Sequence, residues 1–299
     1  MVDILILLHK KGVFMEKLFY DSSSTLYTVY DIKKALKDVG ANECETLFIH
    51  SDIMFGKPAE GFRKKEYISG LFSVLSELQV KNIIVPTFTY SFCNNEVYDI
   101  QNSKTSMGAL NEFIRKQEGR YRTDDPLLSV SVPNSIKELF TKLGNHSLGS
   151  GSALDVIHNM DDVKFLFFGA EMADCFTYVH YVEKMMEVPY RFDMPFTGDV
   201  IYPDGTIKNT QQYIHTQCYG AKLPLKYTYF ENEMEDKGYL LKQRFADRYI
   251  ACISEKDAYR EIKNHIFRNI NYFLEEPFVE SELIHKYTYS TENGRITHC

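Results

Sequence analysis

The sequence predicts an α/β protein: a layered α/β/α core built on a mixed sheet, followed by a small β-hairpin annex and a closing C-terminal helix. Two observations support this fold class. Short apolar runs alternate with amphipathic helical segments as far as Pro189, and beyond it a tight-turn dipeptide precedes a helical repeat. No repeat, low-complexity tract or linker interrupts the chain, so we expect one domain over residues 1–299, with its core at about 30–187 and the annex and helix at about 190–299.

Four apolar runs in the core are predicted to be buried strands, because each is short and bounded by polar or turn-forming residues. They are Thr46–His50, Asn82–Pro86, Leu128–Val132 and Lys164–Phe168. The segments between them show helical spacing of apolar residues with a polar face, which predicts helices. These helices are Lys64–Leu78, Gly108–Lys116, Ser135–Leu143 and Ser152–Asn159.

The chain changes character after Pro189. The Asp204-Gly205 dipeptide suits the positive φ values of a tight turn, and the β-prone pieces 199–202 and 206–208 flank it, so we expect a hairpin there. Apolar residues then recur three or four positions apart over residues 256–275, which predicts the closing helix.

Composition and charge exclude several classes of protein. The net charge of −7 comes without the basic stripe that binds a phosphate backbone, so no nucleic-acid partner is expected. The apolar run Ile4–Leu8 is far shorter than the roughly 20 residues that span a bilayer and has no cleavage site after it, so no membrane partner is expected. The six cysteines are far apart and form no zinc-binding pattern. We therefore expect no metal and a reducing, cytoplasmic location.

The segment from Phe165 to Glu183 indicates a buried strand, a turn at Gly169 and a helix. His180 and Glu183 lie three positions apart, so both side chains share one helix face, where a carboxylate can orient an imidazole. This arrangement suits a general base near the carboxyl edge of a sheet, where open α/β folds bind their ligands. The same spacing also occurs in ordinary surface pairs.

Polar residues follow two of the predicted strands. Residues 50–52 end one strand and Thr87 ends the next, so both sets could line one cleft, although such residues also cap helices. Residues 106–108 precede a predicted helix, whose free N–H groups could bind a pyrophosphate. Alternatively, Thr105 or Ser106 could simply cap the N-terminus of this helix.

Taken in order, these segments resemble the aminoglycoside 3-N-acetyltransferase family, also called the antibiotic N-acetyltransferase family. The resemblance is clearest from about Tyr30 to Glu187. Its motifs are His50-Ser51, Val85-Pro86-Thr87-Phe88-Thr89, Ser106-Met107-Gly108-Ala109-Leu110, Pro126-x-x-Ser129-Val130, Gly149-x-Gly151-Ser152-x-Leu154, the strand leading to Gly169, and Thr177-x-x-His180-x-x-Glu183.

The resemblance implies an acetyltransferase that takes its acyl group from acetyl-CoA without a metal and passes it directly to an amino sugar, as in antibiotic resistance. His180 would be the general base and Glu183 its support. The residues implied for the CoA site are His50, Ser51, Asp52, Thr87, Ser106, Met107 and Gly108. The expected partner is a small-molecule acceptor, and a homodimer is compatible with this interpretation.

The sequence departs from the family pattern at two positions. Resistance-type members commonly read His-Ser-Ser at the first strand end and His-Pro before the Ser-Val element, where this chain has Asp52 and Asp125. Asp124 and Asp125 could bind the cation or hydroxyls of an amino sugar, or they could simply form a loop before Pro126. These departures leave open which acceptor is used.

Three alternatives stay open at this point. The enzyme could acetylate a nucleotide-linked or glycan amino sugar in biosynthesis. A non-catalytic sugar-binding protein could use its 21 tyrosines for stacking. A hydrolase could pair Cys175 with His180, although a buried structural cysteine is the commoner case. For a transferase, we expect the tyrosine-rich residues 213–229 to shape the acceptor pocket.

Overall fold

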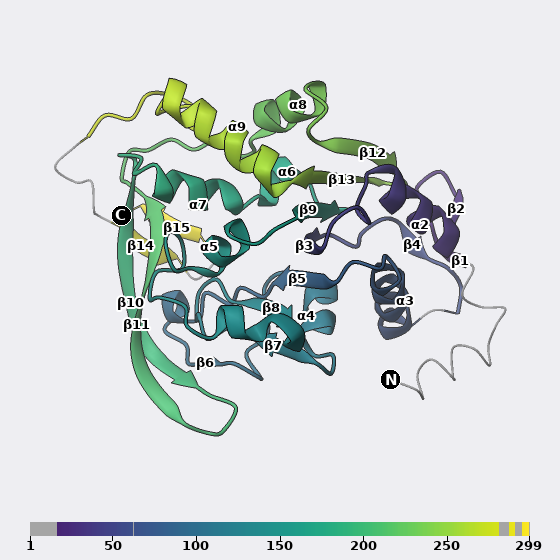
Figure 1. Ribbon diagram of the computed structural model, residues 1–299, viewed down its shortest axis with the longest axis horizontal. Helices are drawn as coiled ribbons and strands as arrows, with labels where there is room; N and C mark the ends of the chain where they lie inside the picture. The colour runs from purple at the N-terminus through teal and green to yellow at the C-terminus, as the bar shows by residue number, and fades with distance from the viewer. Residues whose placement is uncertain (1–16, 62, 281–286, 291–294, 299) are drawn as a thin grey trace.

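The computed structural model describes residues 17–61, 63–280, 287–290 and 295–298. The predicted run Ile4–Leu8 lies outside these residues. At the centre is a seven-stranded sheet in the order β12-β13-β9-β3-β5-β8-β7 (Figure 1). Its strands are β3 (Thr46–Ser51), β5 (Asn82–Pro86), β7 (Arg120–Arg122), β8 (Val130–Pro133), β9 (Val163–Phe168), β12 (Leu241–Phe245) and β13 (Arg248–Ser254).

The sheet is mixed, as the sequence predicts. β3 runs parallel to both β5 and β9, and the remaining neighbours pair antiparallel. The four predicted strands are therefore the adjacent strands β9, β3, β5 and β8. This arrangement brings the carboxyl ends of the three parallel strands to one edge, where ligands bind in folds of this kind.

Helices cover both faces of the sheet, because its central strands alternate the side to which they turn apolar residues. Leu47 and Ile49 of β3 belong to one buried cluster, and Phe48 belongs to the other. The first cluster includes residues of α2 (Val29–Asp38), α3 (Lys64–Ser76) and α4 (Ala109–Arg115). The second includes residues of α5 (Ala153–His158), α7 (Tyr178–Met185) and α9 (Glu255–Arg268). The predicted α/β/α layering is confirmed.

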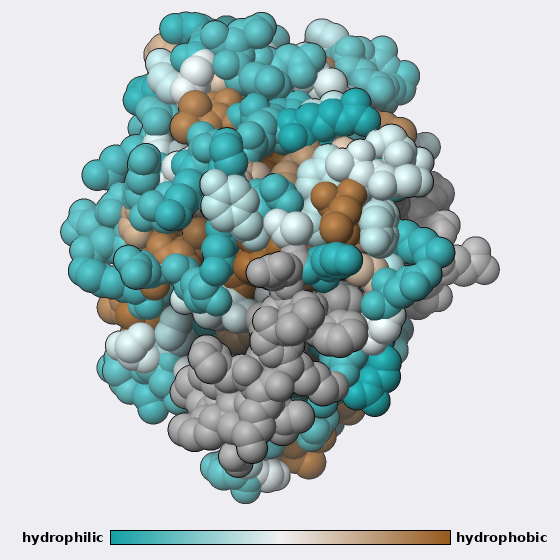
Figure 2. Space-filling view, turned by 90° about the vertical axis from the view of Figure 1, so that its right-hand side faces the viewer, coloured by the Kyte–Doolittle hydropathy of each residue, from teal (hydrophilic) through white to brown (hydrophobic). Residues whose placement is uncertain are grey.

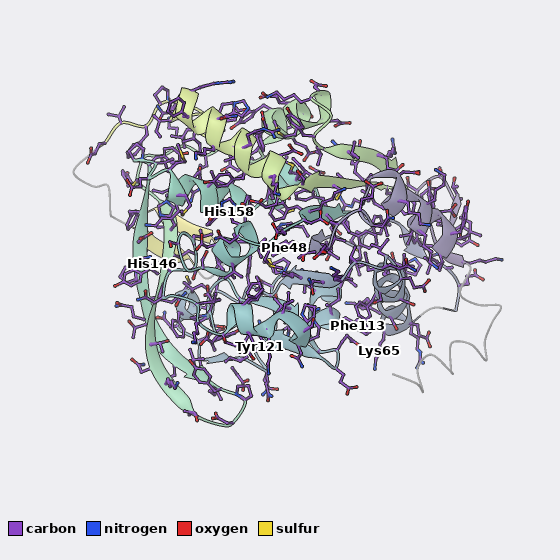
Figure 3. The ribbon with its side chains drawn as sticks, viewed as in Figure 1. Phe48, Lys65, Phe113, Tyr121, His146 and His158 are labelled. Carbon is purple, nitrogen blue, oxygen red and sulfur yellow. The ribbon has the colours of Figure 1, made fainter. Side chains whose placement is uncertain are left out.

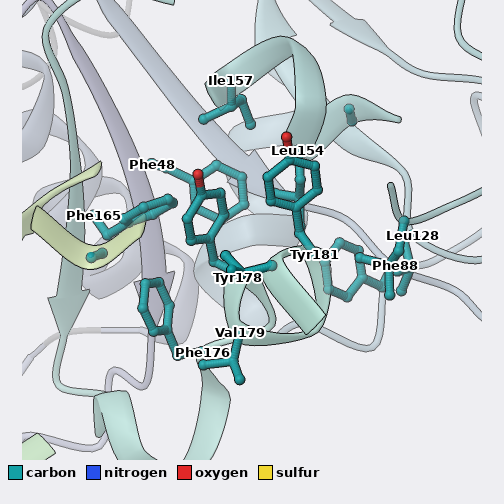
Figure 4. Packing of buried hydrophobic residues seen from close by; sticks show 14 of the residues in the cluster. Phe48, Phe88, Leu128, Leu154, Ile157, Phe165, Phe176, Tyr178, Val179 and Tyr181 are labelled. Carbon is teal, nitrogen blue, oxygen red and sulfur yellow. The ribbon is translucent and has the colours of Figure 1, made fainter. Parts of the chain in front are cut away.

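Aromatic side chains join α7 to the sheet. The Phe165 ring of β9 lies 4.7 Å from the ring of Tyr178 and 5.0 Å from that of Phe176. Figure 4 shows Tyr178 packed among Phe48, Phe165 and Tyr181. Because Tyr178 is 1% exposed, the first turn of α7 is fixed against the sheet by apolar burial.

The predicted hairpin is present but is much longer than expected. Strands β10 (Arg191–Ile201) and β11 (Ile207–Gln217) pair over 11 residues each and form the long ribbon at the left of Figure 1. Gly205 has φ of 83° in the turn, as the Asp-Gly dipeptide predicts. The full length is hard to predict from the sequence because β11 is largely polar and most residues of β10 are only half-buried.

Three further differences concern element type or length. Residues 134–140 form a 3-10 helix (η2, Asn134–Phe140) rather than an α-helix. The closing helix α9 ends at Arg268, seven residues before the predicted end at Glu275, because Asn269 adopts an extended backbone. Strands β12 and β13 follow Pro189 in the chain yet extend the main sheet past the predicted core.

Smaller elements complete the described structure. They are β1 (Lys17–Tyr20), β2 (Leu26–Thr28), β4 (Lys57–Pro58), η1 (Phe92–Asn94), β6 (Tyr98–Asp99), α6 (Met172–Cys175), α8 (Thr228–Asp236), β14 (Tyr287–Ser290) and β15 (Arg295–His298). Seen from the side of β1, β2 and α2, hydrophilic side chains cover most of the visible described surface (Figure 2). Among the described residues, no helix combines the length and apolar character needed to cross a bilayer.

Candidate active site

The two predicted catalytic side chains meet on α7. His180 Nδ1 lies 2.7 Å from Glu183 Oε2, as their spacing of three residues predicts. The Glu183 side chain is 0% exposed, whereas that of His180 is 28% exposed. The carboxylate is therefore enclosed by protein, and the imidazole reaches the surface of a cavity.

Glu183 is held as an anion by neighbours from the start of β10. Arg191 Nε lies 2.7 Å from Glu183 Oε2, and the Tyr190 hydroxyl donates a hydrogen bond of 2.9 Å to Oε1. Burial alone would raise the pKa of Glu183, but the Arg191 charge and the hydrogen bonds from His180 and Tyr190 lower it to about 2. An ionised Glu183 can only accept hydrogen bonds.

This environment assigns the tautomer of His180. The bond to Glu183 is the shorter of the two contacts at Nδ1, and because Glu183 only accepts, this bond requires the proton on Nδ1 and leaves Nε2 with the free lone pair of a base. Arg191 Nη2 lies 2.9 Å from the same Nδ1, but a guanidinium only donates, so in this tautomer Arg191 acts on the ring through its charge rather than through a hydrogen bond. Burial and then the Arg191 charge lower the pKa of His180, against the opposing effect of Glu183. The imidazole is therefore kept neutral, which is the form that can take up a proton.

His180 opens onto a cavity of about 660 Å³ between α7, the open end of the β10–β11 hairpin and the segment 221–227. Tyr90, Leu128, Arg191, His215 and Tyr227 are also part of its wall. The cavity mixes charged, hydroxyl and apolar groups, as sites for polar small molecules do. The tyrosine-rich region contributes Tyr227 and the residues around it, so part of that region lines this cavity.

Two ion pairs attach the hairpin to α7. Besides the Glu183–Arg191 pair, Lys184 Nζ lies 2.6 Å from Asp193 Oδ2. Asp193 faces His215 directly across the hairpin, and its Oδ1 lies 3.0 Å from His215 Nδ1. Burial would raise the pKa of Asp193, but the hydrogen bonds from His215 and Lys184 lower it to about 2. These contacts fix the hairpin against the helix that carries His180.

Most residues predicted for the CoA site gather at the ends of β3 and β5. Ser51 Oγ donates a hydrogen bond of 2.9 Å to Asn111 Oδ1 on α4. Ser106 Oγ donates one of 3.1 Å to the carbonyl of Phe88, the residue after Thr87. Gly108 begins α4 with φ of +91° and lies close to the Ser51 carbonyl. The structure thus brings these sequence-distant segments together.

Three members of this group are bound to other parts of the protein. His50 is 6% exposed and stacks on Phe167, with ring centroids 5.3 Å apart, and burial lowers its pKa to about 3. Thr87 is 0% exposed, and its hydroxyl bonds the carbonyl of Ser129. Asp52 is 40% exposed and forms an ion pair of 3.1 Å with Arg248. Met107 is half-buried.

Gly169 explains how the ends of β3 and β9 approach each other. A Cβ atom at this position would lie 1.9 Å from the carbonyl oxygen of Asp52, and its φ is +77°. Only glycine accommodates both the contact and the backbone angle. The turn that leads from β9 towards α7 is therefore fixed beside the strand end that carries Ser51 and Asp52.

The two candidate acceptor-binding aspartates have structural contacts. Asp125 is 6% exposed, and its Oδ1 accepts hydrogen bonds from the backbone N–H groups of Leu127 and Leu128 and from Ser147 Oγ. Burial raises its pKa. Asp124 Oδ2 accepts a hydrogen bond of 3.2 Å from the Tyr202 hydroxyl. Asp125 thus shapes the loop that places Leu128 in the cavity wall.

The described residues that line the cavity do not include the seven predicted CoA residues or the two aspartates. Cys175, by contrast, lies near His180 in sequence but donates its thiol hydrogen to the Glu171 carbonyl, 3.1 Å away. Burial raises the pKa of Cys175, so it lacks the thiolate character of a nucleophile. In the described parts of the chain, no group of three or more His, Cys, Asp or Glu side chains is arranged to hold a metal ion.

Sequence reasoning missed the hairpin's contribution to this site. Arg191, Asp193 and His215 all lie beyond the point where the family motifs are clear. The alternation of Arg191 and Asp193 with Phe192 is a strand signal that places both charges on one face. Pairing Asp193 with His215 also requires the hairpin register, which the short predicted strands do not give.

An α/β fold with a histidine–carboxylate pair at a cavity of this size is typical of enzymes that act on small molecules. Residues 49–266 match the family model described as aminoglycoside 3-N-acetyltransferase. The chain belongs to this family, which confirms the resemblance drawn from its motifs. A search of curated proteins found no match.

Several solved structures share the fold. Aminoglycoside acetyltransferase AAC(3)-IVa, as apoenzyme, has 15% identity and a TM-score of 0.65, covering 90% of this chain and 96% of its own. AAC-IIIb with CoASH has 16% identity and a TM-score of 0.64, covering 84% and 99%. The YokD protein from Bacillus subtilis has 15% identity and a TM-score of 0.63, covering 81% and 99%. At such identities the likeness establishes the shared fold.

Proposed function

We propose that this enzyme transfers an acetyl group from acetyl-CoA to an amino group of an aminoglycoside or a related amino sugar, with His180 as the general base. The observation that carries the proposal is the His180–Glu183–Arg191 arrangement at the cavity. It gives a neutral imidazole with a fixed tautomer and a free Nε2, which is what deprotonation of an ammonium group requires.

The proposed reaction is a direct transfer. Nε2 of His180 takes a proton from the acceptor's ammonium group, and the resulting amine attacks the thioester carbonyl carbon. A C–N bond forms and the C–S bond breaks. The attacking nitrogen still carries two hydrogens and gives one of them to the departing thiolate, so the neutral amide and the CoA thiol are released. The first proton, held by His180, then passes to solvent. Glu183 orients the ring and stabilises the imidazolium while it exists.

Acetyl-CoA, we infer, approaches along the surface formed by Ser51, Asp52 and the start of α4. Ser106, Met107 and Gly108 lie there, at least partly exposed, beside the ends of the parallel strands. His50 and Thr87 would support this surface from within the fold, given their burial. A solved relative, AAC-IIIb, has CoASH bound, which favours the same donor here. Free cysteines among the described residues suit a cytoplasmic enzyme.

The acceptor would occupy the cavity beside His180. Its wall includes residues from the segment 221–227 and Leu128, whose backbone N–H donates a hydrogen bond to Asp125. Relatives of the same fold have been solved with sisomicin and, as histidine-to-alanine variants, with a gentamicin and with apramycin. These complexes favour a polycationic amino-sugar acceptor for this chain.

The decisive experiment measures thiol release from acetyl-CoA with a panel of aminoglycosides and amino-sugar nucleotides. We expect at least one amine to accelerate thiol release, and His180→Ala to reduce kcat by about 10²- to 10⁴-fold, the usual contribution of a general base. The preferred acceptor separates resistance from biosynthesis.

A matched control is His158→Ala, which removes a histidine of similar exposure that lies on α5 and bonds Glu255. It should keep its turnover per folded molecule. If His180→Ala retains full turnover, the base assignment is wrong, and if no amine accelerates thiol release in the wild-type enzyme, the proposed reaction is wrong.

A further inference from the structure

A second histidine faces the cavity from the hairpin. His215 of β11 is part of the cavity wall, and its side chain is 5% exposed. Its Nδ1 is bonded to Asp193, a residue outside that wall. Nε2 is therefore the ring nitrogen that the bond to Asp193 leaves unused. This atom is buried and has no hydrogen-bond partner among the described residues.

The chemistry of Asp193 determines what this nitrogen can do. With its pKa lowered to about 2, Asp193 is a carboxylate and can only accept hydrogen bonds. Nδ1 of His215 must therefore be the donor, which leaves a bare lone pair on Nε2. Burial lowers the pKa of His215, against the hydrogen bond to Asp193, so the ring stays neutral. Nε2 is thus an acceptor in need of a donor.

An unpaired buried acceptor is costly, and a ligand that supplies a donor removes this cost. Ligands without such a donor leave the nitrogen unpaired and are rejected, which is how buried polar groups give strong discrimination. A molecule that binds in this cavity should therefore bind more tightly if it presents a hydrogen-bond donor to this nitrogen.

The position of His215 relates this requirement to the proposed reaction. One guanidinium connects the two histidines: Arg191 Nη2 lies 2.9 Å from His180 Nδ1, and Arg191 Nη1 lies 3.4 Å from the His215 carbonyl oxygen. The same guanidinium thus contacts the His180 ring and the backbone of His215, which places the two residues next to each other in the cavity wall. A donor that reaches His215 Nε2 belongs to the part of the acceptor that is close to its reacting amine.

We propose that His215 is a specificity-determining residue, whose Nε2 accepts a hydrogen bond from a hydroxyl or second amino group of the acceptor near the amine that is acetylated. This inference rests on the proposed function. It narrows the proposed amino-sugar acceptors to those that carry a hydroxyl or a second amino group at that position. Asp193 is the positioning residue that holds the ring in its tautomer.

Two substitutions separate the two edges of the ring. His215→Asn keeps an amide near the Nδ1 position, able to bond Asp193, but removes the Nε2 acceptor. His215→Gln places an amide oxygen near the Nε2 position and so restores an acceptor. The acceptors are neamine and its singly deoxygenated and singly deaminated analogues, and the measured quantity is the kcat/KM ratio of neamine to each analogue.

With the wild-type enzyme we expect the kcat/KM of one analogue to be about tenfold lower than that of neamine, over and above any reduction shared by all analogues. A factor of this size corresponds to the loss of one hydrogen bond. In His215→Asn that one ratio should fall towards 1 while the ratios for the other analogues persist. His215→Gln should recover part of the discrimination. The KM for acetyl-CoA should stay the same in these variants. If His215 had only a structural role, its substitution would raise the KM values for acetyl-CoA and for all acceptors alike.

The inference is overturned if His215→Asn and the wild-type enzyme discriminate among the analogues identically, even though both acetylate neamine. Calorimetric binding of neamine without acetyl-CoA distinguishes this failure from that of the proposed function. Binding that keeps the His215-dependent pattern without turnover would support the inference and refute the transferase reaction. Absence of both turnover and binding would refute both.

Discussion

His180 and His215 are held by the same chemistry but by different kinds of structure. Each ring bonds an ionised carboxylate through Nδ1, and each lines the same cavity. His180 and Glu183 lie three positions apart on one helix. His215 and Asp193 lie 22 positions apart in the sequence, on two paired strands. The helical pair depends only on local geometry, and the strand pair depends on hairpin register.

This difference teaches which parts of the site can vary. A helix places residues i and i+3 together in any surroundings, so the His180–Glu183 pair remains as long as α7 remains. The His215–Asp193 pair survives only while the two strands keep their alignment, and the ion pair between Lys184 and Asp193 ties that alignment to α7. We expect the first pair to serve chemistry common to the family and the second to tune acceptor choice.

The largest expected effect comes from Glu183→Gln. The shape is kept, but the buried Arg191 loses its counter-charge. The pKa of Glu183 is about 2 against an ordinary 4.5, which corresponds to about 3 kcal/mol of folding free energy. Because the folded pKa is lowered, this stabilisation is complete above pH 4.5 and is lost as the pH falls towards 2. Urea unfolding at pH 7 and pH 3 measures it.

The difference in unfolding free energy between the wild-type protein and Glu183→Gln should therefore be about 3 kcal/mol at pH 7 and clearly smaller at pH 3. An equal difference at both values would mean that Glu183 is not held as an anion. Glu187→Gln on the same part of the chain, next to the C-terminus of α7, serves as a control for loss of one negative charge.

Arg191→Gln is expected to have the next largest effect, through the pH dependence of catalysis. The Arg191 charge lowers the pKa of His180, so its removal should raise that pKa. Since the base acts only when unprotonated, the acid limb of the kcat/KM profile should move to higher pH, with the greatest loss of activity on the acid side. Arg63→Gln, which removes a guanidinium that is 85% exposed, should leave the limb in place. An unmoved limb in Arg191→Gln would refute the electrostatic role.

Asp193→Asn should have a moderate effect on stability. It removes the ion pair with Lys184 and weakens the hydrogen bond from His215, so we expect a loss of about 1–2 kcal/mol in unfolding free energy. The side chain is 21% exposed, which limits the cost through solvent screening. A loss of stability without any change in acceptor preference would separate attachment of the hairpin from positioning of His215.

The smallest effect is expected for His146→Ala. Its Nδ1 lies 3.2 Å from the same Asp193, but the side chain is 38% exposed and stacks on Tyr213 of β11; Figure 3 labels His146 beside the β10–β11 ribbon. Exposed ion pairs contribute little, so we expect a change within about 0.5 kcal/mol and unaltered acceptor preference, both measurable beside Asp193→Asn. A change in unfolding free energy much above about 0.5 kcal/mol would show that the His146 contact contributes to holding Asp193 in place.

The sequence predicts those features that depend on local pattern. The runs that form β3, β5 and β9 are continuous apolar segments, and the His180–Glu183 pair follows from helix geometry. The alternation of Phe192, Met194 and Phe196 in β10 is a strand signal, but β11 is largely polar and lacks a hydrophobic period, so the length and register of the hairpin escape prediction. Strands β12 and β13 escape it because their place in the sheet follows from tertiary pairing with β9.

The site divides along the same line. The burial of Thr87 and His50 could not be predicted, since a polar residue at a strand end can face a cleft or the core with the same sequence. Asp125 illustrates the reverse case, because its loop-forming bonds to Leu127 and Leu128 are the ordinary behaviour of an aspartate before proline. Arg191 could be found only by knowing that β10 begins beside α7.

The length of the hairpin has a practical consequence for redesign. Arg191 and His215 lie at its open end, whereas residues 203–206 at its tip are exposed. The two ends of β10, Arg191 and Ile201, are ten residue steps apart, which corresponds to a length of roughly 33 Å at the rise of an extended strand. An insertion between Asp204 and Gly205 should thus be harmless to turnover, whereas deleting a single residue from the middle of β11 would turn His215 to the opposite face of the ribbon. The tip is a natural attachment point for a label or a fused peptide.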